Sequence, residues 1–104
     1  MSNSYPLLIP SQHPSFPDHF PGDPIVPGAL LLDWIIQSMK KENPEIDIIE
    51  VKSIKFLTTI KPSAMLTIEY TKNRDKNQII SKGYIDNQRA VDCRLIFKLK
   101  EDNT

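Results

Sequence analysis

The chain is organised around one stretch, His19-Phe-Pro-Gly-Asp-Pro-Ile-Val-Pro-Gly28-Ala-Leu-Leu-Leu-Asp33-Trp-Ile-Ile-Gln37. Its first part holds three prolines, which fix φ and lack an N–H donor, so it cannot be regular helix or a central strand. Its second part is an apolar run that follows Pro27, a residue well suited to the first turn of a helix. The stretch therefore predicts a stiff loop leading into a helix that ends at Asn43-Pro44.

The predicted helix is apolar on nearly every face between Leu30 and Met39. Such a helix is expected to be buried on all sides, and not to lie amphipathically on a surface. Asp33 interrupts the apolar run, and Gln37 lies four residues later on the same helix face. The two side chains together predict a polar site within the core.

The remainder of the chain has the patterns of strands. Residues 64–70 and 91–99 alternate with a period of two, which is typical of an antiparallel sheet with one packed face. We expect an edge strand at 5–9 and strands at 51–60, 64–70, 78–85 and 91–99. One long buried helix followed by antiparallel strands predicts an α+β fold with the sheet wrapped around the helix. A chain of 104 residues predicts one domain, over residues 1–104.

The composition excludes several classes of protein. The 13 basic and 13 acidic residues cancel, which argues against a nucleic-acid binder and removes a barrier to self-association. The longest apolar run, 29–36, is far shorter than the roughly 20 residues of a membrane span. No signal peptide pattern begins the chain, so we expect a cytoplasmic protein. The two histidines and the single Cys93 lack metal-ligand spacing, and we expect no metal.

Three residues of the opening stretch have useful chemistry. His19 can act as a base near neutral pH, although a loop histidine of purely structural role is the simpler interpretation. Asp33 in an apolar helix requires a partner, a raised pKa or a path to solvent, because a buried unpaired carboxylate is costly. Gly28 presents its N–H at the positive end of the helix dipole, where a carbonyl oxygen gaining charge would be stabilised; alternatively, it is only a turn residue.

Residues 16–37 resemble the hotdog-fold β-hydroxyacyl-acyl-carrier-protein dehydratases. The shared pattern is His19-Phe-Pro-Gly-x-Pro-Ile-x-Pro-Gly28, followed by the acid at Asp33 and by Gln37. The triplet Leu32-Asp33-Trp34 is most similar to the small dehydratases of bacterial aryl polyene clusters. The resemblance implies a hotdog fold, catalytic roles for His19 and Asp33, and a carbonyl-binding role for Gly28. It also implies a substrate pocket lined by Phe20, Pro27 and Gln37, and a site shared between two chains of a dimer.

The activity implied by the resemblance is dehydration of a (3R)-hydroxyacyl thioester to the trans-2-enoyl thioester, in fatty-acid-like or aryl polyene biosynthesis. No cofactor is implied, since the substrate itself carries phosphopantetheine from acyl carrier protein or coenzyme A. The partners implied are acyl carrier protein and a second hotdog chain, as a homodimer or a heterodimer. Two alternatives stay open: a hotdog acyl thioesterase, and an inactive subunit that binds a carrier protein. Asp18 stands where many relatives have glycine, beside His19.

Overall fold

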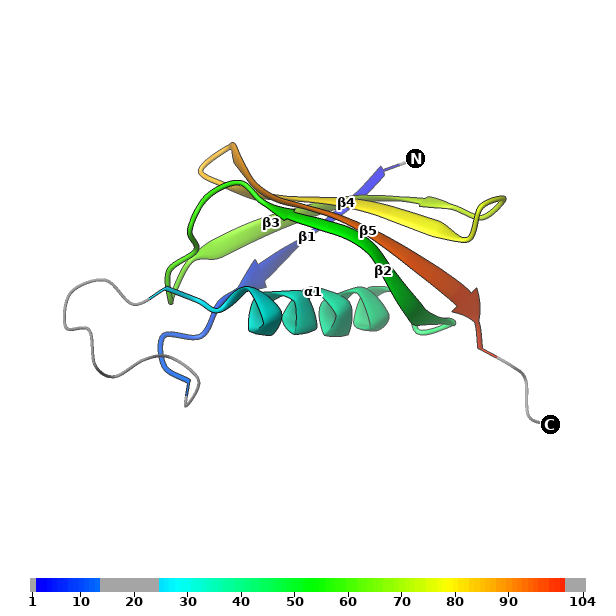
Figure 1. Cartoon of the computed structure of the whole chain (residues 1–104), viewed down its shortest axis with the longest axis horizontal. Helices are drawn as coiled ribbons and strands as arrows, with labels where there is room; N and C mark the ends of the chain where they lie inside the picture. Colours follow the sequence, from blue (N-terminus) through cyan, green and yellow to red (C-terminus); the bar gives the residue numbers. More distant parts are fainter. Residues whose placement is uncertain (1, 14–24, 101–104) are drawn as a thin grey trace.

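The computed structural model describes residues 2–13 and 25–100. Within these ranges the chain forms one antiparallel sheet of five strands and one helix. The sheet arches over the helix, which lies beneath its concave face (Figure 1). The α+β fold predicted from the sequence is thereby confirmed.

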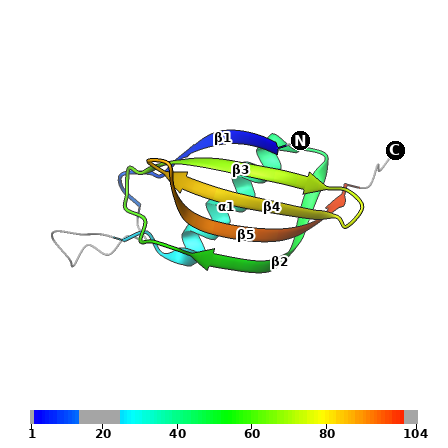
Figure 2. The same cartoon turned by 90° about the horizontal axis from the view of Figure 1, so that it is seen from above.

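The five strands do not lie in the sheet in their chain order. They are β1 (Ser2–Leu8), β2 (Ile46–Phe56), β3 (Met65–Asn73), β4 (Gln78–Ile85) and β5 (Gln88–Leu99), in the order β1-β3-β4-β5-β2. Figure 2 shows this order from above, with the helix crossing beneath. The chain passes from β1 at one edge, through the helix, to β2 at the other edge. The two outermost strands of the sheet therefore flank the helix in the sequence.

The helix α1 (Gly28–Glu42) starts and ends where the prolines predict. Its buried residues are Leu31, Ile35 and Met39, four residues apart, and they face the sheet. The prediction of a helix buried on every face is wrong for the single chain, because Asp33 and Gln37 are exposed. The sheet covers only one side of the helix, so the apolar pattern around the rest of α1 has no covering layer among the described residues.

The end of α1 is fastened to the sheet through Asn43. Its buried amide nitrogen donates to the Met39 carbonyl oxygen at 3.1 Å and to the Tyr70 hydroxyl at 3.2 Å. Lys72 donates to the Asn43 side-chain oxygen at 3.0 Å and pairs with Glu45 at 2.9 Å. This hydrogen bond with the ammonium lowers the pKa of the exposed Glu45 carboxyl. The network joins α1 to β3.

The strand predicted over 51–60 is displaced. β2 begins at Ile46 and ends at Phe56, and residues 57–60 lie outside the sheet. Two register shifts along β2, between residues 48 and 50 and between 51 and 53, break the period of two that would have revealed its start. The tight turn at Asp86-Asn87 joins β4 to β5, and both residues have positive φ, as a type I′ hairpin turn requires.

No helix within the described ranges is long and apolar enough to cross a membrane.

Candidate active site

The first turn of α1 presents a backbone donor. Pro27 precedes the helix in an extended conformation, and its carbonyl oxygen accepts from Leu30 and Leu31 at 3.1 Å. The Gly28 N–H is one of the N–H groups that a helix leaves without an internal acceptor. Among the described residues no acceptor lies within hydrogen-bonding distance of it. An unsatisfied N–H at the positive end of a helix is suited to an anionic or polarised oxygen.

An apolar pocket opens beside this amide. Its volume is about 190 Å³, and it is lined by Ile25, Val26, Gly28, Leu31, Phe56, Thr58, Thr59 and Ile60. The Val26 N–H donates to the Ile60 carbonyl oxygen at 2.8 Å, which ties the segment before the helix to the segment after β2. The pocket therefore places Gly28 beside mainly apolar side chains. This arrangement suits a thioester whose carbonyl oxygen accepts from the Gly28 N–H and whose acyl chain lies in the pocket.

Phe56 is the nearest side chain to Gly28. A methyl group added at Gly28 would lie 3.0 Å from two carbons of the Phe56 ring, closer than side chains normally approach. Glycine at this position thus lets the ring pack over the start of the helix. Phe56 is not among the site residues predicted from the sequence, where it falls in the middle of the strand expected at 51–60; only the end of β2 at Phe56 brings it to the site.

Asp33 lies on the exposed side of α1 and does not line the pocket beside Gly28. Five residues of helix separate Asp33 from Gly28, which turns the two positions by roughly 140° about the helix axis. Within one chain the carboxyl group and the Gly28 amide consequently face different surroundings. The prediction of a polar site in the core by Asp33 and Gln37 is corrected, because both side chains reach solvent in the single chain.

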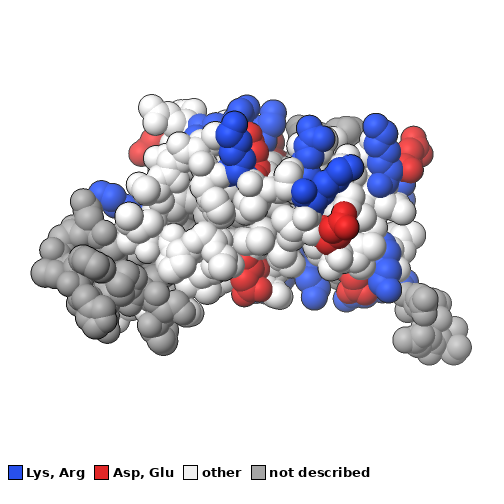
Figure 3. All heavy atoms as spheres, in the orientation of Figure 1, with Lys and Arg blue, Asp and Glu red and all other residues white. Residues whose placement is uncertain are grey.

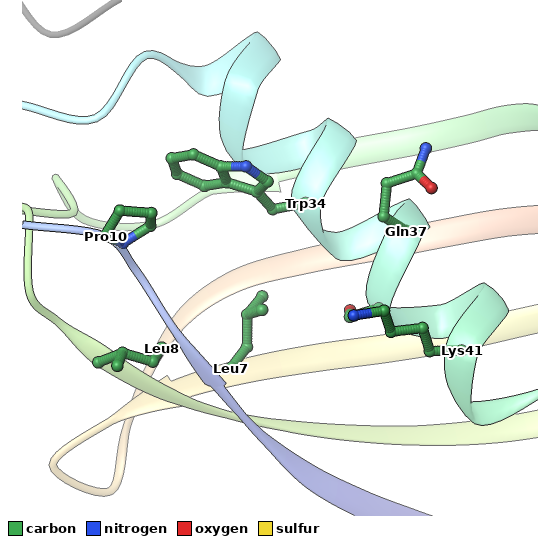
Figure 4. Close-up of a pocket in the computed structure, with 7 residues that line it drawn as sticks. Leu7, Leu8, Pro10, Trp34, Gln37 and Lys41 are labelled. Atoms are coloured by element: carbon green, nitrogen blue, oxygen red, sulfur yellow. The ribbon is translucent and has the colours of Figure 1, made fainter. Parts of the chain in front are cut away.

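Gln37 lines a second hollow, between β1 and α1. It has a volume of about 200 Å³, and its lining residues are Leu7, Leu8, Pro10, Trp34, Gln37, Ser38 and Lys41. Figure 4 shows Trp34 extending from α1 toward Pro10 and Lys41 extending toward Leu7 of β1. His13 packs edge-on against Trp34, with ring centroids 5.6 Å apart. Of these two hollows between described residues, Gln37 lines one and Gly28 the other, and Pro27 lines neither.

His19 and Phe20 lie outside the described residues, so their predicted roles stay predictions. The described residues contain no group of three or more His, Cys, Asp or Glu side chains placed to hold a metal ion. Cys93 is buried, and burial raises the pKa of its thiol to about 11. This thiol is therefore protonated near neutral pH, which makes it a poor nucleophile.

Comparison with known proteins identifies the family. Residues 2–94 match the ApeI-like family, described as ApeI dehydratase. The chain belongs to the ApeI-like dehydratase family. Among curated relatives, it is 27% identical over 96 residues to 3-hydroxyacyl-[acyl-carrier-protein] dehydratase FabZ of Oenococcus oeni, covering 82% of this chain and 69% of that one. It is 29% identical over 97 residues to the FabZ dehydratase of Lactococcus lactis, covering 83% of this chain and 64% of that protein. The chain thus spans about two thirds of the length of these relatives.

Solved structures share the fold of this ApeI-like chain. The dehydratase heterocomplex ApeI:P from Xenorhabdus doucetiae superimposes with a TM-score of 0.75 at 20% identity, covering 92% of this chain and 86% of that one. An acyl-coenzyme A hydrolase from Staphylococcus aureus superimposes with a TM-score of 0.67 at 16% identity, covering 97% of this chain and 64% of that one. Dehydratases and a thioester hydrolase thus share this hotdog architecture, and the fold by itself does not select between their reactions.

Proposed function

We propose that this ApeI-like protein dehydrates a (3R)-hydroxyacyl thioester to the trans-2-enoyl thioester, in fatty-acid-like or aryl polyene biosynthesis. The observation that carries the proposal is the Gly28 N–H at the start of α1, which has no acceptor among the described residues and lies beside an apolar pocket of about 190 Å³. The family membership and the His19 loop motif support it.

The mechanism follows from the chemistry of three groups. The Gly28 N–H donates to the thioester carbonyl oxygen, which makes the hydrogens on the neighbouring carbon more acidic. His19 accepts one of those protons, and the electron pair left behind forms the new carbon–carbon double bond. The C3–O bond breaks, and Asp33, protonated or acting through water, supplies the proton that lets the hydroxyl group leave as water.

The acid would come from a second chain. Asp33 lies on the exposed side of α1, away from the pocket of its own Gly28. A partner chain could bring its own Asp33 to this pocket, which is the reason for expecting a composite site. The partner is a second copy or a sister hotdog chain; the ApeI:P heterocomplex among the structural neighbours supports pairing of this kind.

The substrate brings its own phosphopantetheine arm, from acyl carrier protein or coenzyme A, and the proposed reaction needs no resident cofactor or metal. Substrate specificity on this proposal lies in the acyl pocket, to which Phe20, Pro27 and Gln37 are expected to contribute. The proposed location of the reaction is the cytoplasm, where carrier-bound acyl chains are synthesised.

Replacing the proposed base tests the function. His19→Ala should lower formation of the enoyl thioester by at least about 10²-fold, because general base catalysis typically contributes that much. His13→Ala is the matched control: it removes the other imidazole of the chain, which packs on Trp34, and should keep most of the activity. Enoyl formation is followed by absorbance, and circular dichroism verifies that both variants are folded. Undiminished turnover by His19→Ala would contradict the assignment.

The same assay separates the two alternatives. A thioesterase would release free thiol without forming an enoyl product. An inactive subunit would show neither reaction alone and would gain activity only when its sister chain is added. Dehydration by the purified chain excludes the inactive subunit, and enoyl formation without thiol release excludes the thioesterase.

A further inference from the structure

The outer face of the sheet, away from α1, carries a hollow that the proposed reaction does not use. Its volume is about 310 Å³, and its lining residues are Ser53, Lys55, Ile80, Ser81, Lys82, Asp92, Cys93 and Arg94, from β2, β4 and β5. Figure 3 shows Lys and Arg side chains gathered along the upper margin of the molecule, where Figure 1 places the sheet. The chain as a whole has no net charge, so this concentration of cations is local.

The strand register brings the cations together. Asp92 of β5 is paired with Lys55 of β2 on one side and with Lys82 of β4 on the other. Because neighbouring strands lie about 4.8 Å apart, the backbones at the two lysines are separated by roughly 10 Å across Asp92. Arg94 is two residues further along β5 and points to the same face, roughly 7 Å from Asp92 along the strand. Three cationic side chains thus surround one hollow.

The single carboxylate that lines the hollow belongs to Asp92. Its Oδ1 atom lies within ion-pair distance of a fourth cation, 3.2 Å from Nε of Arg89, but this buried oxygen accepts no hydrogen bond among the described residues. Among the described residues, no carboxylate oxygen lies within ion-pair distance of Lys55, Lys82 or Arg94. Glu69 is paired across the strands with Lys82 but lies outside the hollow and makes no ion pair with it. The hollow therefore has an excess of positive charge that the chain itself does not neutralise.

The cationic groups that line the hollow are suited to binding an oxyanion. A guanidinium fork and two ammonium groups bind phosphate oxygens through charge-assisted hydrogen bonds, and the exposed Ser53 lies at the rim as a further donor. A volume of about 310 Å³ greatly exceeds the share of a water molecule, roughly 30 Å³, and leaves room for a group attached to the phosphate. We infer that this hollow is a binding site for a phosphate ester, separate from the pocket beside Gly28.

Titration of the full chain with inorganic phosphate at constant ionic strength tests the inference, with backbone amide chemical shifts as the readout. Shifts should concentrate in β2, β4 and β5 around residues 53–55, 80–82 and 92–94. Arg94→Met and Lys82→Met should each weaken binding by about fivefold or more, since each removes a charge-assisted contact. The matched control Lys76→Met, in the exposed β3–β4 turn, removes the same charge elsewhere and should leave the affinity unchanged.

Further ligands identify the source of the phosphate. Adenosine 3′,5′-diphosphate represents the nucleotide end of coenzyme A, and phosphopantetheine represents the arm alone. Whichever of the two binds more tightly than inorganic phosphate identifies the molecule that supplies the phosphate. An acidic peptide without phosphate, bound as tightly as the best phosphate ester, would replace the inference with an acidic protein partner. Absence of phosphate binding, or equal weakening by Lys76→Met, would overturn it. None of these readouts depends on dehydratase activity.

Discussion

At the scale of single residues, the contact between Gly28 and Phe56 links the fold to the proposed chemistry. The glycine lets an aromatic ring lie over the first turn of α1, beside the free amide and the apolar pocket. The Phe56 side chain is 44% exposed, so in one chain the ring has room to move outward. The Phe56 ring is thus closely packed against Gly28 on one side and open to solvent on the other.

Gly28→Ala should reduce activity more than stability. Alanine favours a helix over glycine by up to about 1 kcal/mol, which offsets the cost of moving the exposed Phe56 ring. The displaced ring and the new methyl group would crowd the carbonyl position, and kcat/KM should fall about tenfold, less than the 10²–10³ typical of losing a donor outright. Urea unfolding and enoyl formation measure the two effects.

A second substitution provides the control. Phe56→Leu removes the two ring carbons that the added methyl group would approach. In the Gly28→Ala background it should recover much of the lost activity, because the carbonyl position is cleared again. Full activity of Gly28→Ala alone would contradict the expected crowding of the carbonyl position by the methyl group and the displaced ring.

At the scale of elements, the burial of the Tyr5 hydroxyl between β1 and α1 leads us to expect a sensitivity to high pH. The Tyr5 hydroxyl lies 2.7 Å from the Ser38 hydroxyl oxygen, and Ser38 donates its only hydroxyl hydrogen to the Ile35 carbonyl oxygen at 2.8 Å. Tyr5 must then be the donor. Burial raises the pKa of Tyr5 to about 12. A hydrogen bond from Ser38 to the phenolate would lower this pKa, but Ser38 could donate it only by giving up its hydrogen bond to the Ile35 carbonyl oxygen.

The stability of the fold should therefore fall as the pH rises above about 9. Burial raises the pKa of the Cys93 thiol from 9.0 to about 11, and that of the Tyr5 hydroxyl from 10.0 to about 12. The folded chain binds more protons than the unfolded chain in these windows, so its unfolding free energy decreases with pH. Urea unfolding between pH 7 and 11 measures the slope. Cys93→Ala should flatten it from pH 9 upward and Tyr5→Phe from pH 10 upward; equal slopes in all three proteins would contradict this origin.

Some of these elements could be predicted from the sequence and others could not. The helix ends and the Asp86-Asn87 turn follow from local chemistry, because prolines and turn residues act on their own neighbours. The start of β2 does not, because its two register shifts depend on pairing with a strand some 40 residues later. The exposure of Asp33 and Gln37 was missed for a related reason: an apolar pattern shows that a helix face needs cover, but not which molecule supplies it.

The candidate site likewise has one part that the sequence predicts and one part that it does not. The position of Gly28 at the start of α1 was predictable from Pro27 and the apolar run behind it. Phe56 was not, since it reaches Gly28 only because β2 and the start of α1 meet in space. Such contacts between distant segments carry no signature in one sequence.

At the scale of the whole molecule, the two edges of the sheet are not equivalent. The edge strand β1 contains Pro6, which has no N–H to offer a further strand, whereas β2 contains no proline. Exposed large apolar side chains lie on or just beyond β2 at Ile49, Phe56 and Leu57, whereas β1 has one, Leu8. Figure 3 shows the side of the molecule nearest the viewer, where β2 lies in Figure 1, to be mainly uncharged. The β2 edge is therefore the favoured place for a partner chain.

If the two chains of a dimer share each site, two inactive variants should restore one another. His19→Ala lacks the proposed base and Asp33→Asn the proposed acid, but a mixed dimer of the two has one site with both groups intact. Random exchange makes about half of the dimers mixed, each with one working site of two, so activity should return to about a quarter of the wild-type value. The measurement is enoyl formation after the two purified variants are unfolded together and refolded.

The control for this experiment refolds each variant with itself, which should leave it inactive. Refolding affinity-tagged His19→Ala with untagged Asp33→Asn chain, followed by capture of the tag, measures the exchange of subunits, since untagged chain is captured only in mixed dimers. Exchange without recovery in the mixture of the two variants would place the base and the acid in the same chain. That result would require the exposed Asp33 to reach the Gly28 pocket within one subunit, against its position on the opposite side of α1.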